Sequence, residues 1–155
     1  AVSEVFFKEI CELGVPVIVE ADGARRMPCK VPAAHEPVIV PRTTTVCSVY
    51  GLDAIGQRIC DCCFRSELAA EVLGKRETDR LEAADLAKIA ADGNGGCKGV
   101  KRGMDHWVIL NKADTDQRKE SAEEVCRELE RYGNRRILIT FSEETERSEM
   151  FVQKQ

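Results

Sequence analysis

The chain has 155 residues, about the length of one domain, and its 43% hydrophobic and 32% charged residues are typical of a globular rather than a disordered protein. Acidic residues (27) outnumber basic ones (23), and the net charge of −4 argues against a protein that binds a nucleic-acid backbone. No apolar run approaches the roughly 18–20 residues of a membrane-spanning helix, and residues 1–8 lack the apolar core of a secretory signal. We therefore expect a soluble, cytoplasmic protein that binds neither nucleic acid nor membrane.

The N-terminal part of the chain predicts a helix followed by a strand. An amphipathic helix is expected over residues 2–13, with apolar side chains at helical spacing and an end at Gly14. The continuous apolar run 15–19 follows at once and predicts a strand buried on both faces. The proline-rich stretch 28–41 predicts an extended loop with at most a short strand at 38–40.

Strands and helices alternate in the rest of the chain. The β-branched run 43–50 predicts a second strand, and the runs 107–110 and 137–140 predict two more. Helices are expected over 67–73, from a cap at Thr78 or Asp79 to Ala91, and over 116–132. This order predicts an α/β domain over residues 1–141, with three layers and a mostly parallel sheet, followed by a polar tail over 142–155.

An NKxD motif, Asn111-Lys112-Ala113-Asp114, ends the predicted strand at 107–110. Ligands of open α/β sheets bind beyond the carboxyl ends of the strands. The carboxylate of Asp114 can accept hydrogen bonds from the ring N–H and the exocyclic amine of guanine together, which adenine cannot offer. Asn111 can meet the other edge of the base, and the stem of Lys112 can lie over the ring. The motif therefore predicts guanine binding; the alternative is a solvated turn.

A second motif, Glu20-Ala21-Asp22-Gly23, ends the predicted strand at 15–19. Carboxylates in this position suit Mg²⁺, so Asp22 is the candidate metal ligand, and Glu20 and Asp22 are candidate catalytic residues. Gly23 allows close approach of a phosphate, and cations follow it in the sequence. The candidate phosphate-binding residues are Gly23, Arg25 and Lys30. A purely structural acidic turn is the alternative.

A phosphate loop of the form GxxxxGK[ST] does not occur in these 155 residues. The glycine-rich segment 93–99 follows a helix rather than a strand, and its Lys98 precedes a glycine, so a surface turn is expected there. In P-loop proteins the phosphate loop lies upstream of the strand that binds magnesium. Its absence, together with a first residue that is not methionine, is what an N-terminal truncation would produce.

Two further groups of residues could take part in chemistry, although their sequence patterns are less specific. Cys60, Cys62 and Cys63 form a CxCC cluster without the second knuckle of a structural zinc site, which favours reactive or incidental thiols over a metal or redox site. His35 and Glu36, between Pro32 and Pro37, are candidate catalytic residues as a general acid–base pair, or else brace the loop.

The runs 19–24 and 28–37 (VEADGA and PCKVPAAHEP) together resemble the selenium-dependent molybdenum hydroxylase accessory proteins of the YqeC type. Further matches lie at 51–56, 67–70, 98–100 and 111–114. The resemblance implies a P-loop NTPase-like fold whose phosphate loop lies outside this chain. It also implies a role in maturing molybdenum enzymes that contain labile selenium, in bacteria and some archaea. One departure is Phe64-Arg65, where the family pattern has His-Arg.

The resulting hypothesis is an accessory GTP-binding protein that is a slow GTPase when complete. GTP and Mg²⁺ are its expected ligands, and a molybdenum hydroxylase or its maturation proteins are its expected partners. A second functional loop is expected near the phosphates or a cargo, formed by Arg25, Lys30, His35 and Glu36. The hypothesis requires the turns at 20–23 and 111–114 to open onto one crevice. The alternatives are a non-hydrolysing module that holds a cofactor, metal or selenium species, and a degenerate relative that acts through protein contacts.

Overall fold

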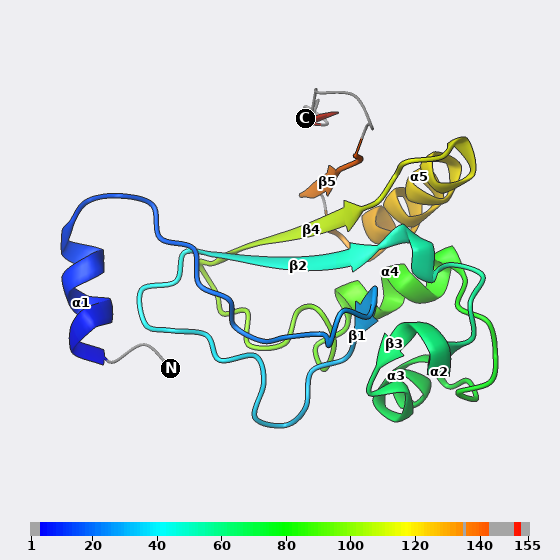
Figure 1. Cartoon of the computed structure of the whole chain (residues 1–155), viewed down its shortest axis with the longest axis horizontal. Helices are drawn as coiled ribbons and strands as arrows, with labels where there is room; N and C mark the ends of the chain where they lie inside the picture. Colours follow the sequence, from blue (N-terminus) through cyan, green and yellow to red (C-terminus); the bar gives the residue numbers. More distant parts are fainter. Residues whose placement is uncertain (1–3, 135, 143–150, 153–155) are drawn as a thin grey trace.

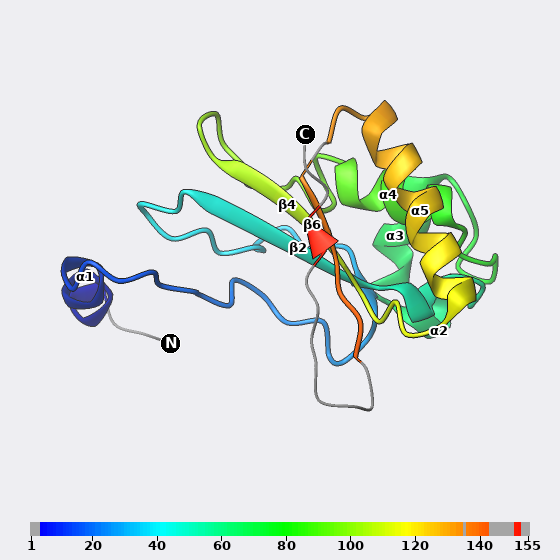
Figure 2. The same ribbon diagram turned by 90° about the horizontal axis from the view of Figure 1, so that it is seen from above.

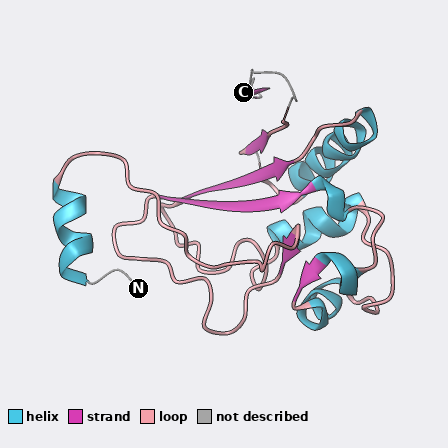
Figure 3. Ribbon diagram, in the orientation of Figure 1, coloured by secondary structure: helices cyan, strands magenta, loops and turns pink. Residues whose placement is uncertain are grey.

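The computed structural model describes residues 4–134, 136–142 and 151–152 (Figures 1 and 3). The helices are α1 (Glu4–Glu12), the 3₁₀ helix η1 (Leu52–Ala54), α2 (Ile59–Cys62), α3 (Ser66–Leu73), α4 (Ala83–Ala91) and α5 (Asp116–Arg131). The strands are β1 (Cys29–Lys30), β2 (Thr45–Gly51), β3 (Cys63–Phe64), β4 (Asp105–Asn111), β5 (Ile137–Ile139) and β6 (Phe151–Val152). None of the helices in the described part of the chain is both long and apolar enough to cross a membrane.

The main sheet has the strand order β2-β4-β5-β6. Strands β2, β4 and β5 are parallel, and β6 runs antiparallel to β5. Gly51 is in register with Asn111, and Leu110 with Ile139, so the carboxyl ends of the three parallel strands lie at one edge. Strands β1 and β3 form a separate parallel pair. The predicted α/β class with a parallel sheet is therefore confirmed.

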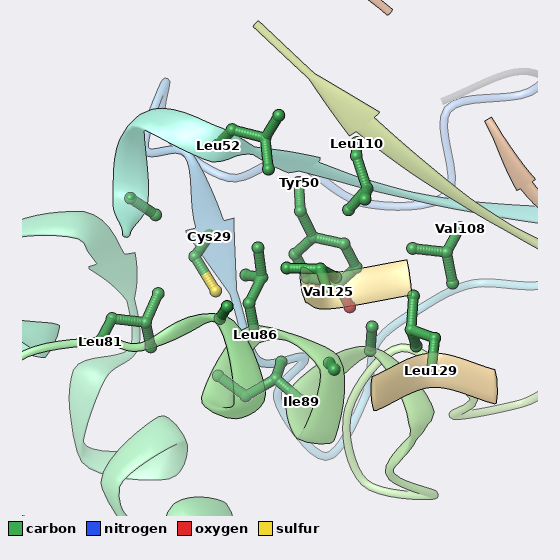
Figure 4. Close-up of a cluster of buried hydrophobic side chains, with 14 of the residues drawn as sticks. Cys29, Tyr50, Leu52, Leu81, Leu86, Ile89, Val108, Leu110, Val125 and Leu129 are labelled. Carbon is green, nitrogen blue, oxygen red and sulfur yellow. The ribbon is translucent and has the colours of Figure 1, made fainter. Parts of the chain in front are cut away.

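The hydrophobic core lies between this sheet and helices α4 and α5. Figure 4 shows their buried side chains meeting those of β2 and β4; they are Leu86, Ile89, Val125, Leu129, Tyr50, Val108 and Leu110. The sheet is covered by helices on this face, while α1 stands away from the other face (Figure 2). On that uncovered face Cys47 and Val49 are exposed. The described residues thus form one helical layer against the sheet, where the sequence predicts layers on both faces.

The prediction of a strand at residues 15–19 is wrong. These residues have no strand geometry, and Ile18 is 98% exposed. A strand requires a neighbour that receives its backbone hydrogen bonds, and no described strand pairs with this segment. The proline-rich stretch is a loop without a strand at 38–40, in keeping with the prediction of at most a short one there, and its strand is Cys29–Lys30. Apolar sequence alone therefore did not identify the strands in this region.

The other predicted elements are confirmed, but some begin at a different residue or are buried on fewer faces than predicted. Helix α4 begins at Ala83 because Glu82 and Asp85 form a capping box. Strand β4 is buried on one face only, since Val108 and Leu110 are buried but Ile109 is partly exposed. Most of the predicted tail over 142–155 lies outside the described residues, but Phe151–Val152 forms β6 and extends the sheet.

Candidate functional site

The NKxD turn lies at the carboxyl edge of the sheet, between β4 and α5. Asn111 Oδ1 accepts hydrogen bonds from the backbone N–H of Lys112 (2.8 Å) and from the hydroxyl of Thr140 (2.9 Å). Lys112 has the left-handed φ of 68°, which its own contact with Asn111 helps to hold. The amide of Asn111 is thus oriented by the end of the neighbouring strand.

Asp114 has a similar link to the segment after β5. Its Oδ1 accepts a 2.7 Å hydrogen bond from the backbone N–H of Ser142, and its Oδ2 lies 3.5 Å from Nη1 of Arg118. The side chain of Asp114 remains 31% exposed. Sequence reasoning missed Thr140 and Ser142, although the end of the predicted strand at 137–140 placed both at the same edge.

The turn after β2 connects the NKxD turn with the N-terminal motif. Lys112 Nζ donates a 2.6 Å hydrogen bond to Oδ2 of Asp53, whose Oδ1 is buried without a hydrogen-bond partner among the described residues. The backbone N–H of Gly51 donates to the carbonyl of Pro28 at 2.8 Å. A Cβ on Gly51 would lie 2.3 Å from Asp53 Oδ1 and 2.8 Å from Pro28 Cβ, so only glycine fits. Sequence reasoning assigned no role to Asp53.

Lys30 is the centre of a second cluster, formed by the N-terminal motif and the proline-rich loop. Its ammonium group lies 2.9 Å from Asp22 Oδ2 and 2.7 Å from Glu36 Oε2, and it donates to the carbonyl of Gly23 at 2.9 Å. The side chain of Lys30 is only 9% exposed. Lys30 therefore holds Asp22 and Gly23 against the loop that contains Glu36.

Glu36 also receives a bidentate pair from Arg65, with Nη1 and Nη2 at 2.8 and 3.0 Å from its two carboxylate oxygens. The hydrogen bonds from Lys30 and then from Arg65 lower the pKa of Glu36 to about 2. A carboxylate with that pKa is a poor proton acceptor near neutral pH. His35 is 79% exposed and its Nε2 lies 3.9 Å from Glu36, so the geometry favours a loop brace over the acid–base pair.

Phe64 provides an aromatic surface beside this cluster. The guanidinium groups of Arg65 and Arg25 lie 4.3 and 4.9 Å from the centre of its ring, and Lys30 Nζ lies 5.9 Å from it. Arg65 has a left-handed φ of 64° at the start of α3. The position at which the sequence departs from the expected histidine is therefore occupied by a ring that contacts three cations.

The glycine-rich turn at 93–99, predicted as a surface turn, contacts the same loop. Lys98 Nζ donates a 2.5 Å hydrogen bond to the carbonyl of Ala33. Gly99 has a φ of +79°, and a Cβ there would lie 3.1 Å from Cγ1 of Ile39. The turn thus packs against the proline-rich loop and helps to hold it in place.

The two predicted ligand-binding segments, 20–23 and 111–114, are linked only indirectly and do not line one groove, as the sequence-based hypothesis required. Residues 22–30 reach the NKxD turn through the Pro28–Gly51 and Asp53–Lys112 contacts. A groove of about 980 Å³ is lined by Asp22, Lys30 and much of β2, but by no residue of 111–114. Glu20 is exposed and forms no hydrogen bond or ion pair with described residues, and Gly23 has open space around its Cα.

The cysteines of the CxCC motif lie in different environments. Cys62 and Cys63 are buried, and burial raises the pKa of Cys62 to about 12, whereas Cys60 is partly exposed. Cys63 is in register with Cys29, which is also buried. Within the described ranges, no group of three or more His, Cys, Asp or Glu side chains is placed to hold a metal ion.

The family comparison concerns the N-terminal part of the chain, which contains the Lys30 cluster. A family model described as "YqeC protein" matches residues 1–67, which include Asp22, Lys30, Glu36 and Arg65. Over these residues the chain is similar to the YqeC family. The family resemblance inferred from the sequence is thereby confirmed. A protein of Escherichia coli strain K12 with the name "Uncharacterized protein YqeC" is 29% identical over 97 residues, 62% of this chain. The matched region spans 38% of that relative's length, and no solved structure matches the chain.

Proposed function

We propose that this chain is part of a GTP-binding accessory protein of the P-loop NTPase type that serves the maturation of selenium-dependent molybdenum hydroxylases. The observation that carries the nucleotide assignment is the placement of Asn111, Lys112 and Asp114 at the carboxyl edge of a parallel sheet, where ligands of such sheets bind. The accessory role in maturation is taken from the YqeC resemblance alone.

The base-binding part of the proposal rests on Asp114. A carboxylate offers about four acceptor positions, and Ser142 and Arg118 take two of them here. The remaining positions suit the two adjacent N–H groups of guanine. The ammonium end of Lys112 is anchored on Asp53, which leaves its aliphatic stem as a surface for the base.

The phosphate part of the proposal rests on Asp22, Arg25 and Lys30. Mg²⁺ is commonly held by one or two carboxylates together with waters and substrate phosphates, so a single aspartate with Glu20 nearby in the chain fits this ion without a larger acidic cluster. Asp22 would hold the ion and Glu20 one of its waters; bound Mg²⁺ would neutralise phosphate charge. Glu36, whose pKa is lowered to about 2 by Lys30 and Arg65, is a weaker base for water than Glu20 in this proposal.

The phosphate loop itself is proposed to come from polypeptide outside these 155 residues, as is the complete GTPase activity. Loss of the terminal phosphate would then free Arg25 and Lys30 to rearrange the loop that contains His35 and Glu36. His35, exposed beside this cluster, is available for a contact with the phosphates or with a cargo.

Isothermal titration with GTP, ATP and xanthosine triphosphate tests this proposal on the longest polypeptide that the gene encodes. We expect GTP to be preferred over ATP. Asp114→Asn should weaken GTP binding about tenfold or more and improve xanthosine triphosphate binding, because an amide can donate to the carbonyl that replaces the amine of guanine. Asp116→Asn is the matched control, since Asp116 is the exposed first residue of α5. Equal binding of GTP and ATP would contradict the assignment of Asn111, Lys112 and Asp114 to guanine binding.

One observation favours the alternative of a non-hydrolysing binding module. Asp22 and Glu36 neutralise Lys30 and Arg65, so protein carboxylates already take the charges that a nucleotide phosphate would need. Elemental analysis of anaerobically purified protein distinguishes the two. Bound metal or selenium in the absence of nucleotide binding would support the module.

A further inference from the structure

A second group of chemically active side chains lies toward the amino end of the sheet, away from the NKxD turn. His106 is the second residue of β4. Its neighbours are Ser48 from β2, Cys97 from the turn after α4 and Asn134 from the segment after α5. All four side chains belong to partly buried residues, and none of them has a role in the proposed function.

The hydrogen bonds of Ser48 determine which ring nitrogen of His106 carries the proton. The hydroxyl of Ser48 donates its single proton to the carbonyl of Gly96 at 2.9 Å. Its oxygen also lies 3.0 Å from Nε2 of His106, so in this second contact Nε2 must be the donor. The neutral imidazole therefore carries its proton on Nε2 and has a lone pair on Nδ1.

Two side chains approach the lone pair on Nδ1 of His106. Oδ1 of Asn134 accepts the backbone N–H of Arg136 at 3.1 Å, which orients its Nδ2 donor toward Nδ1 at 3.4 Å. Sγ of Cys97 lies 3.4 Å from the same nitrogen and 3.6 Å from the carbonyl of Ala90. The imidazole nitrogen is thus the nearer acceptor for the thiol proton, which is the arrangement of a nucleophile and its base.

Burial keeps both members of this pair neutral near pH 7. It lowers the pKa of His106 below its usual 6.5, and together with the charge of Asp92 it raises the pKa of Cys97. Tyr50, which is close to Cys97, is neutral as well because burial raises its pKa. A neutral imidazole can accept a proton, so His106 is available as a base at this pH.

The remaining charges near this pair are taken up by other contacts. Asp105, the residue before His106, forms an ion pair with Arg136. Lys98, the residue after Cys97, donates to the carbonyl of Ala33. His106 is therefore the described base that is placed to receive the proton of Cys97.

We propose that Cys97 is a thiol-modification site, with His106 as its general base and a small disulfide as the reaction partner. As Sγ of Cys97 attacks one sulfur of the disulfide, its proton passes to Nδ1 of His106. The S–S bond of the partner breaks, a mixed disulfide forms on Cys97, and the leaving thiolate takes the proton from His106. The disulfide is itself the oxidant, so the step needs no further reactant. The partner is small because Cys97 is only partly exposed.

The pH dependence of the reaction with 2-hydroxyethyl disulfide tests the proposal on the 155-residue chain. Mass spectrometry of peptides from a quenched time course measures the mixed disulfide at each cysteine. Cys11 is the internal comparison, because it is also partly exposed and no imidazole among the described residues bonds to it. Its rate should rise about tenfold per pH unit between about pH 7 and 8.5, since the thiolate is the reactive form.

The rate at Cys97 should follow the protonation of His106 instead. We expect it to change by about twofold or less between about pH 7 and 8.5, because the base is neutral throughout this range. Below about pH 6 the rate should fall as His106 takes up a proton. The proposal is overturned if the rate at Cys97 rises with pH as steeply as that at Cys11, or if Cys97 forms no mixed disulfide while Cys11 does.

A pair of variants separates the base from its surroundings. His106→Gln keeps a polar side chain without a basic nitrogen, and it should lower the Cys97 rate at about pH 7 by about tenfold or more and restore the steep pH dependence. Asp105→Asn changes the charge next to His106 but keeps the imidazole, and its Cys97 rate should stay within about twofold of the wild type. Circular dichroism checks that both variants are folded. A folded His106→Gln protein that reacts as fast as the wild type also overturns the proposal; if this variant does not fold, the wild-type pH profile decides.

Discussion

The ammonium group of Lys112 lies 2.6 Å from Oδ2 of Asp53, which joins the NKxD turn to the turn after β2. Asp53 in turn follows Gly51, whose N–H is bonded to Pro28. The contact between Lys112 and Asp53 therefore connects the proposed base-binding turn to the segment that contains Lys30.

Replacing Asp53 tests this connection. Asp53→Asn removes the charge that anchors Lys112, and we expect the free energy of unfolding to fall by about 1 kcal/mol, measured by urea denaturation. The same variant should weaken GTP binding, because the stem of Lys112 is no longer held in place. Asp61→Asn is the control, since Asp61 forms an exposed ion pair with Arg58 and should change stability little. Equal effects of the two variants would contradict a special role for Asp53.

Glu36→Gln should be more destabilising than a typical surface substitution. It leaves Arg65 without its bidentate partner and removes one of the two carboxylates that neutralise the nearly buried Lys30. We expect a loss of about 2 kcal/mol in urea denaturation. Glu128→Gln, which breaks an exposed pair with Arg131, serves as the control and should cost far less. A loss no larger than that of the control would show that the cluster is not a structural brace.

The pH dependence of stability follows from the same carboxylate. The pKa of Glu36 falls from 4.5 to about 2 on folding, so the unfolded chain takes up this proton first as the pH falls. The stabilisation is complete above pH 4.5 and is lost progressively between 4.5 and about 2. The difference in unfolding free energy between the wild type and Glu36→Gln should therefore shrink over this range. A difference that stays constant would show that Glu36 titrates normally.

Phe64→Leu tests the aromatic surface beneath the cations. The change keeps an apolar side chain but removes the ring that Arg25 and Arg65 contact, and we expect a loss of about 1 kcal/mol. Phe64→Tyr keeps the ring and should preserve most of the stability. Thermal unfolding of the three proteins gives the comparison. If leucine and tyrosine behave alike, packing rather than the contact with cations explains the effect.

The thiols should differ widely in reactivity. In the folded protein N-ethylmaleimide should modify Cys47 first, because it is exposed, and Cys29, Cys62 and Cys63 last, because they are buried. Burial also raises the pKa of Cys62 to about 12, which reduces its reactive thiolate. Mass spectrometry of a time course measures the order, and the unfolded chain, in which all eight cysteines should react, is the control. Fast native modification of Cys62 would contradict the buried position.

Several parts of the candidate site could be predicted from local sequence. The position of the NKxD turn follows from the apolar strand before it and the capped helix after it, since Thr115 accepts a hydrogen bond from the N–H of Arg118 at the start of α5. The contacts of Glu36 could not be predicted in the same way. Its partner Arg65 is 29 residues away, and only the pairing of β1 with β3 brings them together.

The amino-acid sequence by itself determined helices α1, α3, α4 and α5, the three parallel strands β2, β4 and β5, and the motifs at their ends, because hydrophobic period, capping residues and glycines act over a few residues. The tertiary structure alone decided that residues 15–19 stay outside the sheet and that Asp53, Phe64, Arg65 and Thr140 join the motifs. Backbone pairing and charge neutralisation depend on neighbours that are distant in the chain, and a strand without such a neighbour does not form, however apolar its residues are.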